Sequence, residues 1–140
     1  MPLGTLDHCS IRTVKLEASR AFYMKVLGMD VGDRPNFPFP GYWLYINGCT
    51  VVHLVGVDAD DPSGLVGYLG GEIDPAALEG SGSFDHIAFR ATDAPSMIKR
   101  LSSNNVPYRE RQVPDMALYQ LFVEDPNGIT VELNYFDSEQ

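Results

Sequence analysis

Three histidines and one glutamate occupy matched positions in two similar parts of the sequence. His8 lies in the run LDHCSIRT at residues 6–13, and His86 lies in the similar run FDHIAFRA at residues 84–91. His53 and Glu132 form a second matched pair at almost the same interval. The chain contains 3 histidines, so the repeat accounts for every imidazole that it has.

Imidazole and carboxylate groups are ligands for first-row divalent metals. If two like modules pair about a pseudo-twofold axis, matched positions converge on one point, and His8, His86 and Glu132 could hold one metal ion there. Three ligands on one side of an octahedral ion leave positions open for substrate and dioxygen, which favours Fe(II), with Mn(II), Ni(II) or Zn(II) as alternatives. Ligation would also offset the desolvation cost of burying the Glu132 carboxylate in an apolar strand.

Each of these residues also has an ordinary structural interpretation. A single histidine in an apolar strand is more often a satisfied core residue than a ligand. Glu132 could equally point to solvent from an edge strand. Because four such residues occupy two pairs of matched positions, the metal site is the better interpretation of the set.

The elements that would position these residues also repeat. Each half begins with a short strand-like run, continues with a helical pattern at residues 16–26 or 94–103, and ends in about three strands. The later strands are predicted at residues 42–46, 50–55, 118–123 and 129–134. The Asn47-Gly48 pair and the turn at residues 125–128 are hairpin signals, and Gly28, Asn104 and Asn105 suit the left-handed conformation after a helix.

Length and composition fit one globular domain of 140 residues, with 44% hydrophobic and 21% charged residues. We expect a first module at about residues 4–56, a connector at 57–83 with a short helical turn at 75–78, and a second module at 84–136. Two cysteines are too few for a disulfide framework, which favours a reducing, cytoplasmic location. A net charge of −9 and the lack of a long apolar run argue against nucleic-acid and membrane partners and favour a small-molecule substrate.

The paired βαβββ modules, the two Asp-His runs, the helix end FYMKVLG at residues 22–28 and the tail DPNGITVEL at residues 125–133 together resemble the vicinal-oxygen-chelate superfamily, across almost the whole chain. This superfamily includes glyoxalase I, epimerases, drug-binding proteins and extradiol dioxygenases. The resemblance implies an α+β fold with a cupped mixed sheet, often completed by exchange between the subunits of a homodimer. It also implies that His8 and His86 are first-strand metal ligands and that Glu132 is the last-strand ligand.

The residue type at the position of His53 distinguishes the subfamilies of this superfamily. Glyoxalase I and the epimerases typically carry a glutamate or glutamine ligand there, whereas extradiol dioxygenases have a non-ligating histidine that serves as acid and base. The resemblance therefore favours an extradiol-type dioxygenase with a catechol-like substrate and His53 as the catalytic residue. One departure is Phe122, which stands where ring-cleaving dioxygenases place a tyrosine. Tyr119 would replace that phenol only if its strand bulged.

The run RPNFPFPGYW at residues 34–43 is rich in aromatic residues and proline. It could form a rigid wall for a flat aromatic substrate, with Trp43 in contact with it, or it could be a packed loop that covers a sheet edge. Arg12 and Arg90 are also matched by the repeat, and either could steer an anionic substrate or form a surface ion pair.

Two other functions remain open at this point. A glyoxalase-like lyase or an epimerase would use His53 as a fourth ligand and act through a metal-stabilised enediolate. A drug-sequestering protein would bind its ligand without metal chemistry, although such members generally lack the metal ligands.

Overall fold

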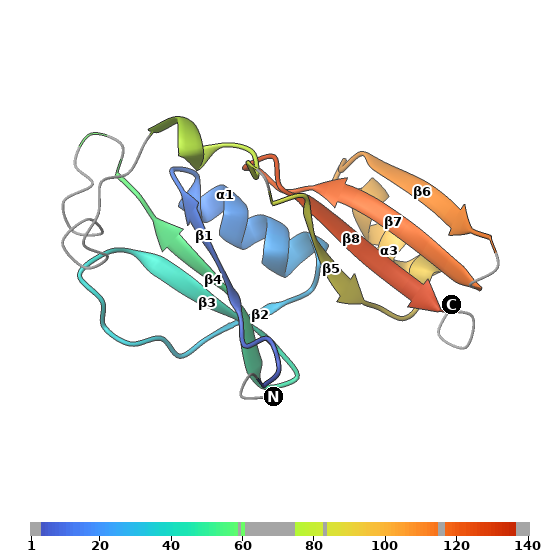
Figure 1. The fold of residues 1–140 in the computed structure, drawn as a ribbon, viewed down its shortest axis with the longest axis horizontal. Helices are drawn as coiled ribbons and strands as arrows, with labels where there is room; N and C mark the ends of the chain where they lie inside the picture. The colour runs from blue at the N-terminus through green and yellow to red at the C-terminus, as the bar shows by residue number, and fades with distance from the viewer. Residues whose placement is uncertain (1–3, 59, 61–74, 83, 115–116, 137–140) are drawn as a thin grey trace. The chain divides into compact units, whose positions relative to one another are not determined.

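The structure is a computed structural model that describes residues 4–58, 60, 75–82, 84–114 and 117–136. The chain divides into two compact units, Met1–Leu78 and Glu79–Gln140 (Figure 1). The boundary between them lies inside the predicted connector, most of which is outside the described residues. The arrangement as one domain of two modules therefore stays a prediction.

The first unit contains a four-stranded mixed sheet in the order β1-β4-β3-β2. The outer strand β1 runs parallel to β4, whereas the other neighbours are antiparallel. The elements in chain order are β1 (Cys9–Thr13), α1 (Leu16–Ala21), η1 (Phe22–Val26), β2 (Asp30–Gly32), β3 (Gly41–Ile46), β4 (Cys49–Gly56) and the short 3₁₀ helix η2 (Pro75–Leu78).

The second unit repeats this topology. Its sheet has the order β5-β8-β7-β6, again with one parallel pair, β5 and β8. The elements are β5 (His86–Arg90), α3 (Ala94–Ser103), β6 (Tyr108–Val113), β7 (Leu118–Glu124) and β8 (Thr130–Phe136). The α+β class and the two βαβββ modules predicted from the sequence are confirmed, and each module forms a mixed sheet of its own.

Strand register confirms the repeat residue by residue. Ser10 pairs with His53 across β1 and β4, and the matched residues Ala88 and Glu132 pair across β5 and β8. On the other side, His53 pairs with Trp43 and Glu132 pairs with Phe122. Neighbouring residues in register project to the same face of a sheet. His53 and Glu132 therefore occupy equivalent places in the two units.

Within each unit, among the described residues, a helix packs against one face of the sheet. In the second unit α3 lies against one side of the sheet (Figure 1). The buried residues Leu121, Val131, Leu133 and Tyr135 share a face, and Leu101 of α3 is also buried. Glu132 alternates with these residues along β8 and therefore lies on the opposite face. In the first unit α1 contacts β4, and the hydroxyl of Tyr42 donates to Glu17 on α1, so Tyr42 lies on the face that carries the helix. Trp43 follows Tyr42 in β3 and pairs with His53, so both of these residues lie on the opposite face.

The local signals in the sequence explain where the helices and turns begin and end. The helix predicted at residues 16–26 is present, although its second part, Phe22–Val26, is a π-helix, and Gly28 after it has a φ of 82°. The Asn47-Gly48 turn has φ values of 50° and 81°, as a two-residue hairpin with positive φ at both positions requires. In the second unit Asn105 has a φ of 56° just beyond α3.

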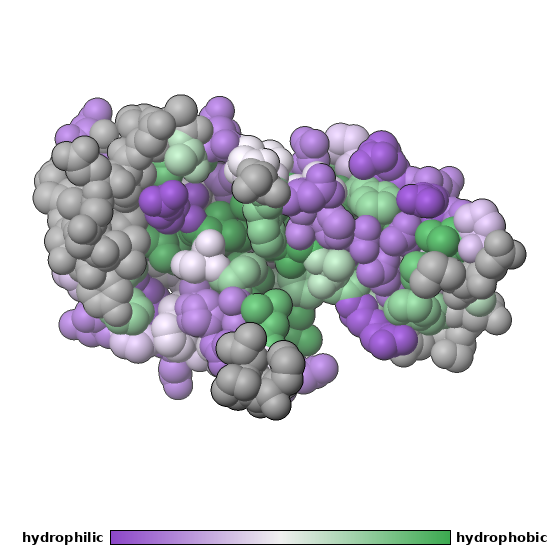
Figure 2. Space-filling model, viewed as in Figure 1, coloured by the Kyte–Doolittle hydropathy of each residue, from purple (hydrophilic) through white to green (hydrophobic). Residues whose placement is uncertain are grey.

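The surface carries hydrophobic as well as polar side chains (Figure 2). Two of the large exposed hydrophobic residues, Leu6 and Phe84, are matched by the repeat and have 87% and 53% of their surface exposed. Within the part of the chain that the structure describes, no helix is long and apolar enough to cross a membrane.

Candidate metal centre and adjoining pocket

His53 lies between two other aromatic rings. The His8 ring stacks on one side of it, with centroids 3.8 Å apart and planes inclined by 17°, and the Trp43 ring stacks on the other at 4.0 Å and 7°. The register explains this stack, because Trp43 and Ser10 flank His53 in the sheet and His8 lies two residues before Ser10. The sequence-predicted residues His8, His53 and Trp43 are therefore brought together in the first unit.

The His53 side chain is buried, with 8% of its surface exposed. Its Nε2 atom has no hydrogen-bond partner among the described residues. Burial, and secondly the neighbouring His8, lower the pKa of His53, because a cation is disfavoured where water is excluded and a second imidazole lies nearby. The neutral ring is therefore the favoured form at neutral pH, and it can accept a proton.

His8 and His86 share the same arrangement of side chains. The Nδ1 atom of His8 lies 2.5 Å from Oδ2 of Asp7, and the Nδ1 atom of His86 lies 2.7 Å from Oδ2 of Asp85. An ionised carboxylate can only accept, so each Nδ1–H donates, and in the neutral form of each ring Nε2 keeps its lone pair. The Asp85 contact also raises the pKa of His86. A carboxylate on the far nitrogen is the usual partner of a metal-binding histidine.

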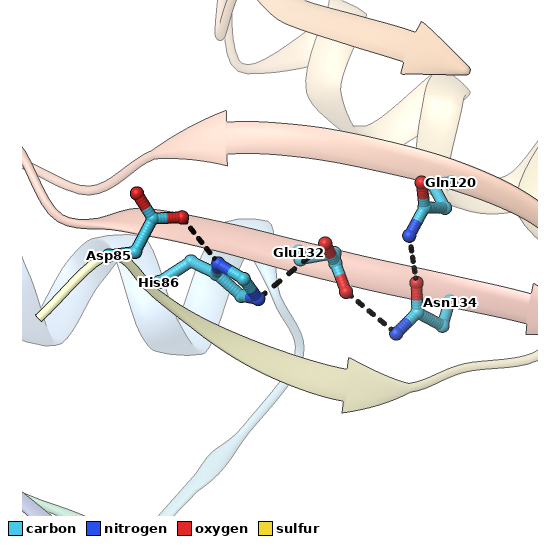
Figure 3. A network of polar contacts seen from close by, with 5 residues as sticks. All are labelled: Asp85, His86, Gln120, Glu132 and Asn134. Carbon is cyan, nitrogen blue, oxygen red and sulfur yellow. Dashed lines mark hydrogen bonds and ion pairs between the residues drawn. The ribbon is translucent and has the colours of Figure 1, made fainter.

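Glu132 is held by a chain of amide groups on the same face of the second sheet (Figure 3). The Nδ2 atom of Asn134 donates to Oε2 of Glu132 at 2.9 Å, and the Nε2 atom of Gln120 donates to Oδ1 of Asn134 at 3.0 Å. The other carboxylate oxygen, Oε1, lies 3.7 Å from Nε2 of His86. Asn134 therefore occupies one oxygen of Glu132 and leaves the other directed toward His86.

These residues fit a divalent metal. The 3.7 Å between His86 Nε2 and Glu132 Oε1 is too long for a hydrogen bond, but one ion with bonds of about 2.0–2.2 Å can contact both atoms. The third predicted ligand, His8, belongs to the first unit. Among the described residues no group of three or more such side chains is gathered in one place. The complete three-residue set stays a prediction, supported by the chemistry of each half.

A pocket of about 560 Å³ opens beside the histidine stack in the first unit. His8, His53 and Trp43 line it together with Arg12 and residues of the predicted aromatic wall. In that wall the rings of Phe37 and Phe39 stack at 5.2 Å and 6°. The segment at residues 34–43 thus contributes to the pocket, as the wall interpretation predicts.

The two candidates in β7 have different surroundings. Phe122 pairs with Glu132 and lies on the same face of the sheet, under the guanidinium of Arg109 at 5.1 Å. Tyr119 pairs with Tyr135 instead, in a register without a bulge, and its hydroxyl donates to Glu110 at 2.5 Å. Tyr119 therefore lies on the face opposite Glu132 and does not supply the phenol that is missing at Phe122.

Four residues that hydrogen-bond to the proposed ligands or to their partners were not predicted as site residues from the sequence. Asp7 and Asp85 immediately precede the two histidines, and this repeated Asp-His pair was a visible signal. Asn134 lies two residues after Glu132 in an alternating strand, so its shared face was also predictable. Gln120 gave no such signal, because its role depends on the pairing of β7 with β8.

The family model described as Glyoxalase/Bleomycin resistance protein/Dioxygenase superfamily matches residues 5–133. This chain belongs to that superfamily. It is 29% identical to glyoxylase I 4 of Arabidopsis thaliana over 97% of this chain and 73% of that protein. It is 26% identical to the lactoylglutathione lyase of Pseudomonas putida over 91% of this chain and 82% of that protein.

Solved structures show the same superfamily fold. A glyoxylase/bleomycin resistance protein/dioxygenase domain from Frankia sp. EAN1pec matches with a TM-score of 0.67 and 16% identity, over 94% of this chain and 91% of that chain. At this identity the likeness shows the fold alone. The superfamily predicted from the paired modules, the two Asp-His runs, the helix end and the tail is confirmed, and the comparisons do not single out its dioxygenases.

Proposed function

We propose that this member of the superfamily is an enzyme that binds one divalent metal ion through His8, His86 and Glu132. The observation that carries the proposal is the Asp-His pair present in both units, in which the aspartate engages Nδ1 of the histidine and leaves Nε2 of the neutral ring as the metal-binding atom. In the second unit Glu132 lies next to His86 with one oxygen held by Asn134. Fe(II) is the favoured ion, and Mn(II), Ni(II) and Zn(II) suit the same ligands.

His53 is proposed as an acid and base outside the ligand set. A nitrogen lone pair lies in the plane of its ring, and the rings of His8 and His53 are stacked in nearly parallel planes 3.8 Å apart at their centroids. One ion cannot lie in both planes, which favours His8 alone as the ligand of that pair. His53, neutral and buried, is then available to exchange a proton at Nε2.

The favoured reaction is extradiol-type ring cleavage of a catechol-like molecule. A bound divalent metal would supply a Lewis acid with open positions for vicinal substrate oxygens. The pocket beside His53 offers aromatic side chains to a flat ring, and Nε2 of His53 takes a hydroxyl proton and later returns it. Replacement of the usual tyrosine by Phe122 means that this position supplies no phenol.

Ring cleavage is tested with protein loaded with Fe(II) and incubated in air with a panel of catechols, with absorbance of the ring-opened product as the signal. We expect product from the wild type and at least a hundredfold less from His53→Ala, a usual range for loss of a general base. No product across the panel, with bound iron verified, would exclude ring cleavage.

The names of the two relatives favour a second reaction, that of a glyoxalase-like lyase. It would use Zn(II) or Ni(II), require no oxygen, and employ His53 as a fourth ligand. The test is anaerobic turnover of the hemithioacetal formed by methylglyoxal and glutathione. Turnover by the Ni(II) form would establish this reaction, whereas its absence in metal-loaded protein would leave ring cleavage as the remaining proposal.

Two further properties belong to the same proposal. We expect a homodimer, as the resemblance to the superfamily implies, and we take the exposed, repeat-matched residues Leu6 and Phe84 as candidate interface residues. We also expect a cytoplasmic enzyme whose partner is a small molecule. Sedimentation at several concentrations tests the dimer, and a Leu6→Glu, Phe84→Glu variant should shift it toward monomer.

A further inference from the structure

The aromatic wall of the first unit carries a fixed guanidinium group. Arg34 lies over Phe37 at 5.1 Å and over Phe39 at 5.4 Å. Its Nη2 atom donates a hydrogen bond to the carbonyl oxygen of Phe39 at 2.7 Å. Stacking and this hydrogen bond hold the side chain in place, so the rest of its donors are oriented before any ligand binds.

Among the described residues, most hydrogen-bond donors of Arg34 have no protein acceptor. A guanidinium has five N–H donors, and among the described residues Arg34 makes one hydrogen bond and no ion pair with a carboxylate. The group is half-buried, and this burial lowers its pKa. A partly desolvated cation without a counter-ion is stabilised by an anion that can accept from its free edge.

The charge of the pocket also differs from that of the chain. The protein has a net charge of −9, yet two arginines, Arg12 and Arg34, line this pocket. The acidic residue among the lining residues is Asp7, which is engaged by His8. The pocket therefore attracts a small anion that most of the surface would repel.

The remaining walls suit a flat ring. Phe37, Phe39 and Trp43 line the pocket together, and the volume of about 560 Å³ falls within the usual range for small-molecule sites. The edge of a planar guanidinium matches a planar carboxylate with two parallel hydrogen bonds. A monoanion is favoured over a dianion, because the cost of removing charge from water rises steeply with the charge.

We propose that this pocket binds an aromatic carboxylate, with Arg34 donating hydrogen bonds to the carboxylate and the rings of Phe37, Phe39 and Trp43 surrounding the arene. As a statement about substrate class the inference rests on the proposed function, since His8 and His53 line the same pocket. Arg12 adds a second positive charge at the pocket.

The test measures binding to protein freed of metal by a chelator, so that it does not depend on the metal site or on turnover. Benzoate binding is measured by calorimetric titration and, in parallel, by the change in fluorescence of Trp43, which is the single tryptophan in the sequence. Benzamide is the uncharged analogue of the same shape, and cyclohexanecarboxylate is the anion without an aromatic ring. We expect the wild type to bind benzoate at least about tenfold more tightly than either analogue. Benzamide lacks the charge that strengthens the hydrogen bonds to Arg34, and cyclohexanecarboxylate lacks the ring that stacks on the aromatic wall.

Variants assign the effect to Arg34. Arg34→Gln should lose the preference for benzoate over benzamide, Arg34→Lys should keep part of it, and Arg111→Gln, an exposed arginine on β6, should bind as the wild type does. Circular dichroism checks that each variant is folded. Equal binding of benzoate and benzamide by the wild type, or no binding of benzoate, would overturn the inference whether or not the protein holds a metal. If the proposed function is wrong and this inference is right, the wild type would bind no divalent metal and would still bind benzoate more tightly than benzamide.

Discussion

The two Asp-His pairs are the residues on which the metal assignment depends most directly. In both units a carboxylate one residue before the histidine fixes the imidazole through Nδ1. Such a partner orients the ring and makes the other nitrogen a better ligand. The histidines were predictable because the repeat singled them out. Asp7 and Asp85 repeat with them, but only the side-chain contacts show that each aspartate engages Nδ1 of its histidine.

Asp85→Asn is predicted to weaken metal binding by about 10- to 100-fold, as loss of a carboxylate partner of a ligating histidine usually does. Asp7→Asn is the matched variant in the other unit and should have a similar effect. Competition with a metal-sensitive chelator dye measures both. Asp93→Asn, which changes a carboxylate that caps α3 away from these histidines, is the control. Wild-type affinity in both Asp7 and Asp85 variants would contradict the role given to them.

Tyr119 and Tyr135 lead to a prediction about alkaline pH. Burial in the first place raises the pKa of each phenol to about 12, and for Tyr119 the bond to Glu110 adds to the effect. A raised pKa means that the folded state favours the neutral phenol. The stability that this contributes is complete below pH 10, the ordinary tyrosine value, and is lost as the pH rises from about 10 through about 12.

The measurement is an absorbance titration of the tyrosines, together with urea unfolding at pH 9 and pH 11. We expect Tyr119 and Tyr135 to titrate late, alongside Tyr42, whose pKa is raised by its hydrogen bond to Glu17, and the free energy of unfolding to fall between the two pH values. Tyr119→Phe should remove one late phenol and leave metal affinity unchanged, because Tyr119 lies on the face opposite Glu132. A loss of metal affinity in this variant would refute that placement.

Strands and helices were largely predictable, because hydrophobic periodicity and turn residues mark them. The turn at residues 125–128 is an example, since Asp125 accepts from the backbone of Asn127 and Ile129 and Gly128 has a φ of 83°. The strands β2 and β6 were not assigned to residues, because β2 has three exposed residues and β6 is mostly exposed and charged. The π-helix at Phe22–Val26 has the same periodic side chains as an α-helix, so the sequence did not distinguish the two.

Gly41 links the aromatic wall to the sheet at the start of β3. A Cβ atom at this position would overlap the carbonyl oxygen of Leu54 and lie 3.1 Å from Nη2 of Arg34. Gly41→Ala must therefore displace the backbone of β4 or move the wall, and we predict a loss of about 1–3 kcal/mol in the free energy of unfolding. Urea unfolding measures it. Gly4→Ala, where nothing lies within 4 Å, is the control, and equal stability of the two variants would contradict the prediction.

The whole molecule joins two units that each contain part of the proposed metal site. His8 belongs to one unit, and His86 and Glu132 belong to the other. The sequence predicted the two modules from their repeat, because each module is defined by local patterns. It could not predict how the modules come together, within one chain or between two, because that depends on contacts between distant surfaces.

Metal binding should therefore stabilise the molecule as a whole. A ligand that binds only the folded state adds about 2.7 kcal/mol when its concentration is a hundred times Kd. We expect Mn(II) at that excess to raise the Tm of the wild type and to leave the Tm of Glu132→Gln nearly unchanged. Scanning calorimetry measures both proteins with and without the ion. An equal rise in the variant would show that the ion binds elsewhere.

The metal content of anaerobically purified protein tests the central claim most directly. Wild type, His53→Ala and His86→Ala are purified in parallel, and bound metal is measured by mass spectrometry. The proposed site predicts close to one ion per chain in the wild type and in His53→Ala, and loss of the ion in His86→Ala, because His86 is a ligand and His53 is not. Loss of the metal from His53→Ala would contradict the three-ligand site and favour the lyase, and retention of the metal by His86→Ala would contradict the site itself.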